Sequence, residues 1–189
     1  MKDKETRAMT NEMRAVLNGD GKRVIIGYAA KYNSKTELYK GLYEIIEPGA
    51  FDDVLDQDVR ALFNHDPNFV LGRTKAGTLK LSVDEDGLKY EISPPDTQVA
   101  KDLIESISRG DVSQSSFGFK VKTDSITEHA DGTFTRSIRK VDKLFDISPV
   151  TYPAYEDTAV AMRSKIDYQK KKHRNDLVKN EIELFEINN

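Results

Sequence analysis

The amino-acid sequence predicts a single-domain protein that is mostly β, with a few helices beside the strands. The chain has 189 residues, of which 38% are hydrophobic, and this is enough for one core with some length left for tails. Alternating apolar residues recur along most of the chain, whereas only one segment has the clear period of an amphipathic helix. Clusters of Asp, Asn, Gly and Pro separate these segments, as expected of a strand-rich fold.

Composition excludes several classes of function. A net charge of −3 and a pI near 5.7 give no basic surface for nucleic acid. The absence of cysteine excludes disulfides, thiolate zinc sites and a cysteine nucleophile. No run approaches the roughly 18 apolar residues of a membrane helix, and the first residues lack the apolar centre of a signal peptide. We therefore expect an intracellular protein with no membrane or nucleic-acid partner.

The two ends of the chain differ in character from its middle. Residues 1–21 have no strong period and end in the turn sequence Asn18-Gly19-Asp20-Gly21, so they are predicted to form an N-terminal arm. Residues 22–160 are predicted to form the folded domain. Residues 161–189 carry a basic run followed by an acidic end, which is typical of a solvated helix or a charged C-terminal tail.

The first half of the predicted domain contains three strands. Residues 24–30 alternate but are partly apolar on both sides, which predicts a strand buried on both faces. Residues 42–46 repeat the strand pattern, and residues 59–63 form a third strand that runs directly into His65. Between the second and third strands, residues 51–55 are predicted to form a short helix, because aspartates occupy its first turn.

The second half begins with a hairpin and the one clear helix. Residues 79–83 and 88–92 alternate on either side of an Asp- and Gly-containing turn, which predicts a β-hairpin. After two prolines the period changes to that of a helix, with Asp96 or Thr97 as the N-terminal cap and Gly110 as the stop. The predicted apolar face of this helix consists of Val99, Leu103, Ile104 and Ile107.

The remaining strands carry the candidate chemistry. Residues 117–121 alternate, a returning strand starts near Phe134 after a turn, and residues 144–150 are predicted to form a further strand. A serine becomes a nucleophile only beside a base, and the base in turn needs an orienting acid. Ser116, His65 and Asp146 supply these residue types on three separate segments. We therefore predict that the three side chains meet.

Each of these residues also has an ordinary structural explanation. Ser116 could make a cross-strand hydrogen bond, His65 could be satisfied by a backbone carbonyl, and Asp146 could cap the turn before Pro149. The three histidines are scattered, and no group of residues has metal-binding spacing. There is also no phosphate loop and no dinucleotide-binding glycine pattern. We therefore predict neither a metal nor a cofactor.

Six short motifs occur in the same order as in the prohead maturation proteases of tailed bacteriophages. The chain resembles this family from about residue 23 to residue 158, which is most of its length. The motifs are Glu47-Pro48-Gly49-Ala50-Phe51, Asn64-His65-Asp66-Pro67, Leu71-Gly72-Arg73-Thr74, Gly110-Asp111-Val112, Ser116-Phe117-Gly118-Phe119 and Ile147-Ser148-Pro149-Val150-Thr151-Tyr152-Pro153-Ala154-Tyr155.

The resemblance implies a fold and a set of roles. The fold would be a β barrel surrounded by helices, similar to the herpesvirus capsid assembly protease. His65 would be the general base, Ser116 the nucleophile and Asp146 the third member, where relatives often carry glutamate. Ser115 is a second hydroxyl beside the first, and Ser116 is preferred because it directly precedes the Phe-Gly-Phe sequence. The backbone amides of residues 148–151 are candidates for the oxyanion hole.

The resemblance also implies a biological role. The substrate would be the scaffolding part of the phage major capsid protein, cut inside the immature capsid (prohead) in the host cytoplasm, with self-cleavage and self-association as further expectations. One alternative is a catalytically silent internal scaffold or capsid assembly chaperone. Another is an esterase or amidase for small molecules, which is less favoured because the chain lacks the Gly-x-Ser-x-Gly elbow of the common hydrolase fold.

Overall fold

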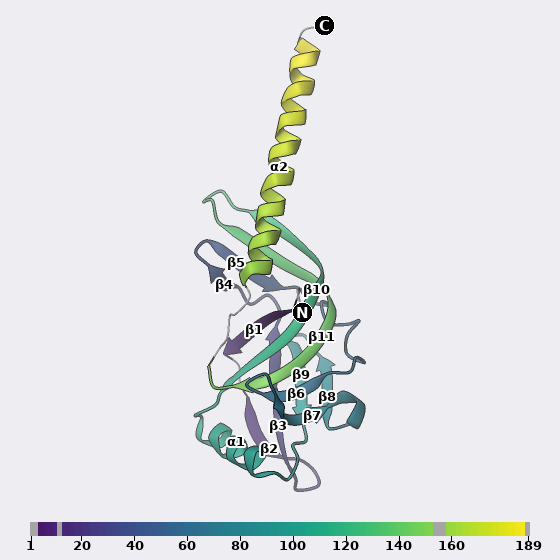
Figure 1. Cartoon of the computed structure of the whole chain (residues 1–189), viewed down its shortest axis with the longest axis vertical. Helices are drawn as coiled ribbons and strands as arrows, with labels where there is room; N and C mark the ends of the chain where they lie inside the picture. The colour runs from purple at the N-terminus through teal and green to yellow at the C-terminus, as the bar shows by residue number, and fades with distance from the viewer. Residues whose placement is uncertain (1–3, 11–12, 153–157, 188–189) are drawn as a thin grey trace.

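The computed structural model describes residues 4–10, 13–152 and 158–187, and nearly half of these residues lie in the strands of two β-sheets (Figure 1). The prediction of a mostly β fold is therefore confirmed. The strands are β1 (Glu5–Thr10), β2 (Arg14–Leu17), β3 (Arg23–Lys31), β4 (Thr36–Tyr39), β5 (Leu42–Ile46), β6 (Arg60–Phe63), β7 (Asp66–Arg73), β8 (Leu79–Val83), β9 (Gly87–Ile92), β10 (Gln114–Glu128) and β11 (Phe134–Val150). The helices are the 3-10 turn η1 (Thr74–Ala76), α1 (Gln98–Arg109) and α2 (Thr158–Ile187).

The larger sheet is built around the long antiparallel hairpin of β10 and β11. Its main order is β1-β10-β11-β5-β4, and β6 also pairs with β11 and carries β7 beside it. Both β5 and β6 lie parallel to β11, β5 against its first residues and β6 against its last ones. The sheet therefore branches along one edge of β11, and its described branches end in β1, β4 and β7.

The predicted β barrel is wrong, because neither sheet closes on itself over the residues that the structure describes. The smaller sheet has the order β2-β3-β9-β8, and all its pairs are antiparallel. The main hydrophobic core contains buried side chains from both sheets and from α1, among them Ile25, Tyr90, Ile104, Phe117 and Phe119. The apolar faces are therefore buried between two open sheets, and not inside the closed barrel that the family resemblance implied.

The predicted helix and the predicted β-hairpin in the second half of the chain agree with the structure. Helix α1 spans residues 98–109, its cap Thr97 accepts a hydrogen bond from the Ala100 amide, and Gly110 ends it with a φ of 85°. The hairpin of β8 and β9 is also present. One face residue was misassigned, since Ala100 is buried whereas Val99 is 38% exposed.

Other local predictions need correction. Residues 51–55 form successive turns rather than a helix. Residues 144–150 are the last part of β11 rather than a separate strand. Residues 1–21 were predicted to be an arm outside the domain, but β1 pairs with β10 and β2 pairs with β3. The segment 161–189, predicted to be a solvated helix or a charged tail, falls largely within α2, which contacts the larger sheet along its first half, as far as Lys172, and then extends away from it (Figure 1).

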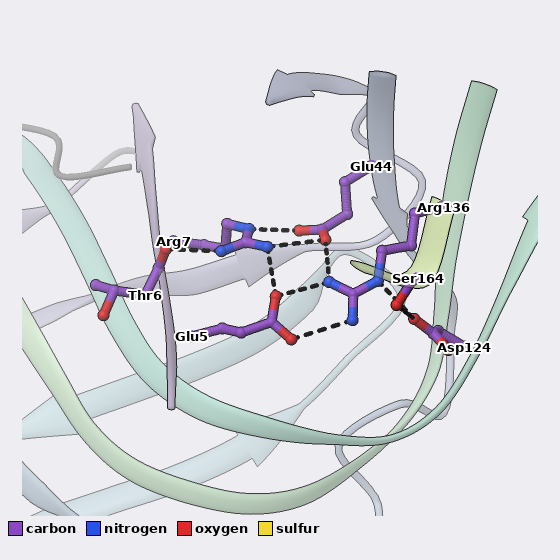
Figure 2. A network of polar contacts seen from close by, with 7 residues as sticks. All are labelled: Glu5, Thr6, Arg7, Glu44, Asp124, Arg136 and Ser164. Carbon is purple, nitrogen blue, oxygen red and sulfur yellow. Dashed lines mark hydrogen bonds and ion pairs between the residues drawn. The ribbon is translucent and has the colours of Figure 1, made fainter. Parts of the chain in front are cut away.

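A buried cluster of charged side chains fastens β1 to the larger sheet (Figure 2). Arg7 donates to Glu44 at 2.6 Å and to Glu5 at 2.6 Å. Arg136 donates to the same two carboxylates and, at 2.6 Å, to Asp124. Burial lowers the pKa of both guanidinium groups, but the surrounding carboxylates outweigh it and raise the pKa of each. Both guanidinium groups therefore stay charged within the cluster.

Candidate active site

His65 lies in the two-residue turn between β6 and β7. Phe63 and Asp66 pair across this hairpin, and the two central residues, Asn64 and His65, have φ values of 52° and 59°. Positive φ at both positions is typical of a type I′ turn, in which Asn and His are tolerated better than most residues. The Asn64 amide donates to the Pro149 carbonyl at 3.0 Å. The imidazole is thus held beside the end of β11.

Two neighbouring serines on β10 point to opposite sides of the strand. The Ser115 hydroxyl lies 2.6 Å from the hydroxyl of Tyr90 and is buried in the core. The Ser116 Oγ lies 2.6 Å from Nε2 of His65. Because side chains alternate along a strand, only one of the two hydroxyls can face the imidazole, and it is that of Ser116.

Asp146 approaches the other nitrogen of the imidazole from β11. Its Oδ2 atom contacts His65 Nδ1 and accepts a hydrogen bond from Ser148 Oγ at 3.1 Å, and its Oδ1 atom accepts one from Lys4 Nζ at 2.7 Å. Burial raises the pKa of this carboxyl group, but the contacts with His65 and Lys4 outweigh burial and lower the pKa. Asp146 is therefore ionised at neutral pH.

Gly118 leaves room for the Asp146 carboxylate because it has no side chain. Gly118 on β10 lies directly across from Asp146 on β11. A Cβ atom at residue 118 would come 2.6 Å from Asp146 Oδ1 and 2.3 Å from Cε of Lys4. The glycine in the Ser-Phe-Gly-Phe motif is thus required by close packing beside the carboxylate.

The three sequence-predicted residues lie in the order alcohol, imidazole, carboxylate. An ionised carboxylate can only accept hydrogen bonds, so it places the proton of neutral His65 on Nδ1 and leaves Nε2 free to accept. Such an imidazole can take the proton of Ser116 as its oxygen attacks an electrophile.

Comparison with known proteins agrees with this chemistry. The family model described as Caudovirus prohead serine protease matches residues 9–173. The chain belongs to the prohead serine protease family. The prohead protease of Enterobacteria phage HK97 is 31% identical over 164 residues, which cover 83% of this chain and 68% of that relative. No solved structure matches the chain, and the predicted likeness to the herpesvirus assembly protease stays a prediction.

The structure adds two contacts to this prohead serine protease that the sequence did not indicate. Lys4 lies in the segment that was predicted to be an arm, and Ser148 was noted only as part of a motif. Both side chains donate to Asp146. The signal for Ser148 was its position two residues after Asp146 on the same strand, which puts both side chains on one face. No local signal links Lys4 to a residue 142 positions away.

The predicted oxyanion-hole segment of the protease has fewer free donors than expected. Among residues 148–151, Pro149 has no amide hydrogen, and the Thr151 amide donates to Asn64 Oδ1 at 2.9 Å. The Thr151 interaction instead helps to fix the turn that carries His65. The amides of Ser148 and Val150 lie in β11 opposite Ser116 and Gln114 of β10, so the assignment of the oxyanion hole to this segment stays a prediction.

Neither a metal site nor a membrane-spanning helix occurs among the described residues. No group of three or more His, Asp or Glu side chains within 4–10, 13–152 and 158–187 has an arrangement that could hold a metal ion. Over the same residues, no helix combines the length and apolarity needed to cross a bilayer.

Proposed function

We propose that this family member is a serine endopeptidase with a Ser116-His65-Asp146 triad. The proposal is carried by one observation: Ser116 Oγ lies 2.6 Å from His65 Nε2 while His65 Nδ1 contacts Asp146 Oδ2. In this assignment Ser116 is the nucleophile, His65 the general base and acid, and Asp146 the group that orients the imidazole and stabilises its charged form.

The reaction follows from these positions. His65 Nε2 takes the proton of Ser116 as Oγ bonds to the scissile carbonyl carbon, giving a tetrahedral oxyanion. His65 then gives this proton to the amine of the leaving peptide, and the C–N bond breaks to leave an acyl-enzyme. Water attacks the acyl carbon while His65 again accepts a proton. The bond between the acyl carbon and Oγ then breaks, and His65 returns the proton to Ser116 Oγ. Asp146 stays ionised throughout.

The proposed substrate is the scaffolding part of the major capsid protein of the same phage, cut inside the prohead in the host cell. Support comes from the family description and from the relative named prohead protease. The chain itself is a second proposed substrate, and its self-cleavage is followed in the same gel experiment as cleavage of the capsid protein. The herpesvirus-like fold would be consistent with this role.

The experiment co-expresses the capsid protein with the protease and follows cleavage by gel electrophoresis and mass spectrometry. Ser116→Ala is expected to lower the cleavage rate by about a thousandfold or more, since the covalent step is lost. Ser115→Ala is the matched control, because it removes the neighbouring hydroxyl and keeps the triad. Circular dichroism verifies that both variants fold.

The outcomes separate this proposal from a scaffold role. A Ser116→Ala chain that still cuts the capsid protein would overturn the triad. A wild-type chain that promotes shell assembly without any cleavage would favour the silent scaffold or chaperone. Loss of cleavage in Ser115→Ala with activity kept in Ser116→Ala would assign the nucleophile to the other serine.

A further inference from the structure

The nucleophile of the proposed triad is covered by strand β1. Ser116 is 0% exposed, although the side chain of its partner His65 is 18% exposed. β1 lies antiparallel to β10 with Ala8 directly opposite Ser116. A peptide substrate therefore has no path to the serine oxygen from the side on which β1 lies.

The backbone of β1 also competes for the serine proton. Ser116 Oγ donates to the Arg7 carbonyl oxygen at 3.0 Å while lying 2.6 Å from His65 Nε2. A hydroxyl has one hydrogen, so the proton directed at the Arg7 carbonyl is not directed at the base. The Arg7 carbonyl thus occupies the space beside Ser116 Oγ that the scissile carbonyl of a substrate needs. It accepts a hydrogen bond from the serine there and is not placed for nucleophilic attack by Oγ.

Side chains of the same segment fix β1 in this place. Arg7 and Glu5 enter the buried charge cluster with Glu44 and Arg136 (Figure 2). Lys4, just before the strand, donates to the triad carboxylate of Asp146. Together with the hydrogen bond from Ser116 to the Arg7 carbonyl, the Lys4 contact joins β1 and the residue before it to both ends of the triad.

β1 nevertheless has the features of a strand that can be displaced from its sheet. It has six residues and lies at the end of the strand order, so β10 is its one neighbour in the larger sheet as described. Its departure would expose the backbone amides and carbonyls of β10 from Gln114 to Phe119, on either side of Ser116. An exposed strand edge binds an extended peptide through main-chain hydrogen bonds.

We propose that β1 is an inhibitory strand that occupies the binding site of an extended peptide substrate on β10, and that proteolysis requires its displacement. This inference rests on the proposed function, since it assumes that Ser116 is the nucleophile. The ligand class is an unfolded or extended polypeptide, which would replace β1 beside Ser116.

A reversible cross-link tests the proposal in the full chain. Thr10 and Gln114 are direct partners in the β1–β10 register, and the chain has no cysteine, so T10C/Q114C introduces one disulfide and no other thiol. A fluorophosphonate probe, which bonds to an accessible activated serine with loss of fluoride, reports access to Ser116. Labelling of the oxidised variant is expected to be at least tenfold slower than labelling of the same variant after reduction.

The controls make the result specific. Wild-type protein should label at the same rate with and without oxidant, and Ser116→Ala should not label. Cleavage of fluorescent casein, an unfolded polypeptide, should fall together with labelling. Hydrogen exchange on the wild-type chain needs no variant, and the β1 amides are expected to exchange at least tenfold faster than the β11 amides of residues 144–148.

Several results would overturn the proposal. Equal labelling of the oxidised and reduced variant would remove the inhibitory role while leaving the nucleophile assignment intact. Failure of the disulfide to form would contradict the pairing of β1 with β10 on which the proposal depends. β1 amides as protected as those of β11 would contradict a displaceable strand. A new N-terminus at Ala8 in the reduced protein would make β1 a substrate. A wild-type chain that neither labels nor cuts would instead remove the proposed function, and the inhibitory role with it.

Discussion

Gly118 lies directly opposite Asp146 across the β10–β11 pair, and its lack of a side chain creates the space that the carboxylate occupies. The glycine belongs to the motif that carries the nucleophile, and the aspartate lies 28 positions further along the chain, directly before the motif that begins at Ile147. Their pairing fixes the register that brings Ser116 and Asp146 to the same imidazole. Steric fit between two strands thus links two motifs that the sequence presents separately.

Gly118→Ala is expected to lower kcat/KM by about tenfold to a hundredfold, because the methyl group would displace the Asp146 carboxylate. The measurement is cleavage of co-expressed capsid protein or of casein. Gly19→Ala is the matched control, since a Cβ atom there meets nothing within 4 Å. Unchanged kcat/KM in Gly118→Ala would show that the carboxylate tolerates the shift.

Ser148→Ala is expected to lower kcat by about tenfold with KM unchanged. The buried Ser148 hydroxyl donates to Asp146 at 3.1 Å, and a hydrogen bond to a charged group contributes about 1.5–3 kcal/mol. Steady-state kinetics separates this positioning role from substrate binding. Ser108→Ala on α1, whose hydroxyl donates to the Ile104 carbonyl, should keep kcat within about twofold. A rise in KM alone would assign Ser148 to binding.

Arg136→Met is expected to lower the free energy of unfolding by about 3–5 kcal/mol. The guanidinium is 1% exposed and pairs with Glu5, Glu44 and Asp124, so its removal leaves the two buried carboxylates of Glu5 and Glu44 with Arg7 as their remaining cation in the cluster. Urea denaturation monitored by circular dichroism measures the change. Arg139→Met on the same strand is the control, because that side chain is 59% exposed and its loss should change the free energy by less than about 1 kcal/mol. Similar values for the two variants would show that the cluster is not needed for stability.

Protein stability should depend on pH through Asp146. Its pKa is lowered in the folded chain, so the ionised carboxylate stabilises the fold above the unfolded pKa of about 3.9, and this contribution is lost as pH falls through the folded pKa. The stability difference between wild type and Asp146→Asn should therefore be largest near pH 6 and shrink toward pH 3. Urea denaturation at several pH values checks this. Asp142→Asn, with a carboxylate 46% exposed, is the control, and a difference that grows on acidification would contradict the assignment.

The sequence by itself determined the class of fold and the local elements that depend on short-range patterns. Alternation predicted β8 and β9, and the cap and stop residues Thr97 and Gly110 bounded α1 almost to the residue. The ordered motifs also identified the family and the candidate residues His65, Ser116 and Asp146. These features could be predicted because periodicity, capping and motif order are properties of neighbouring residues.

Only the tertiary structure decided how distant segments meet. The partners of β1 and β2, the parallel pairing of β5 and β6 with one edge of β11, and the contact between Lys4 and Asp146 have no local signal. Likewise, the neighbours of Ser115 and Ser116 determined which hydroxyl faces His65. The physical reason is that strand pairing and burial of charge depend on contacts between residues far apart in the chain, and these form only when the two sheets pack around a common core.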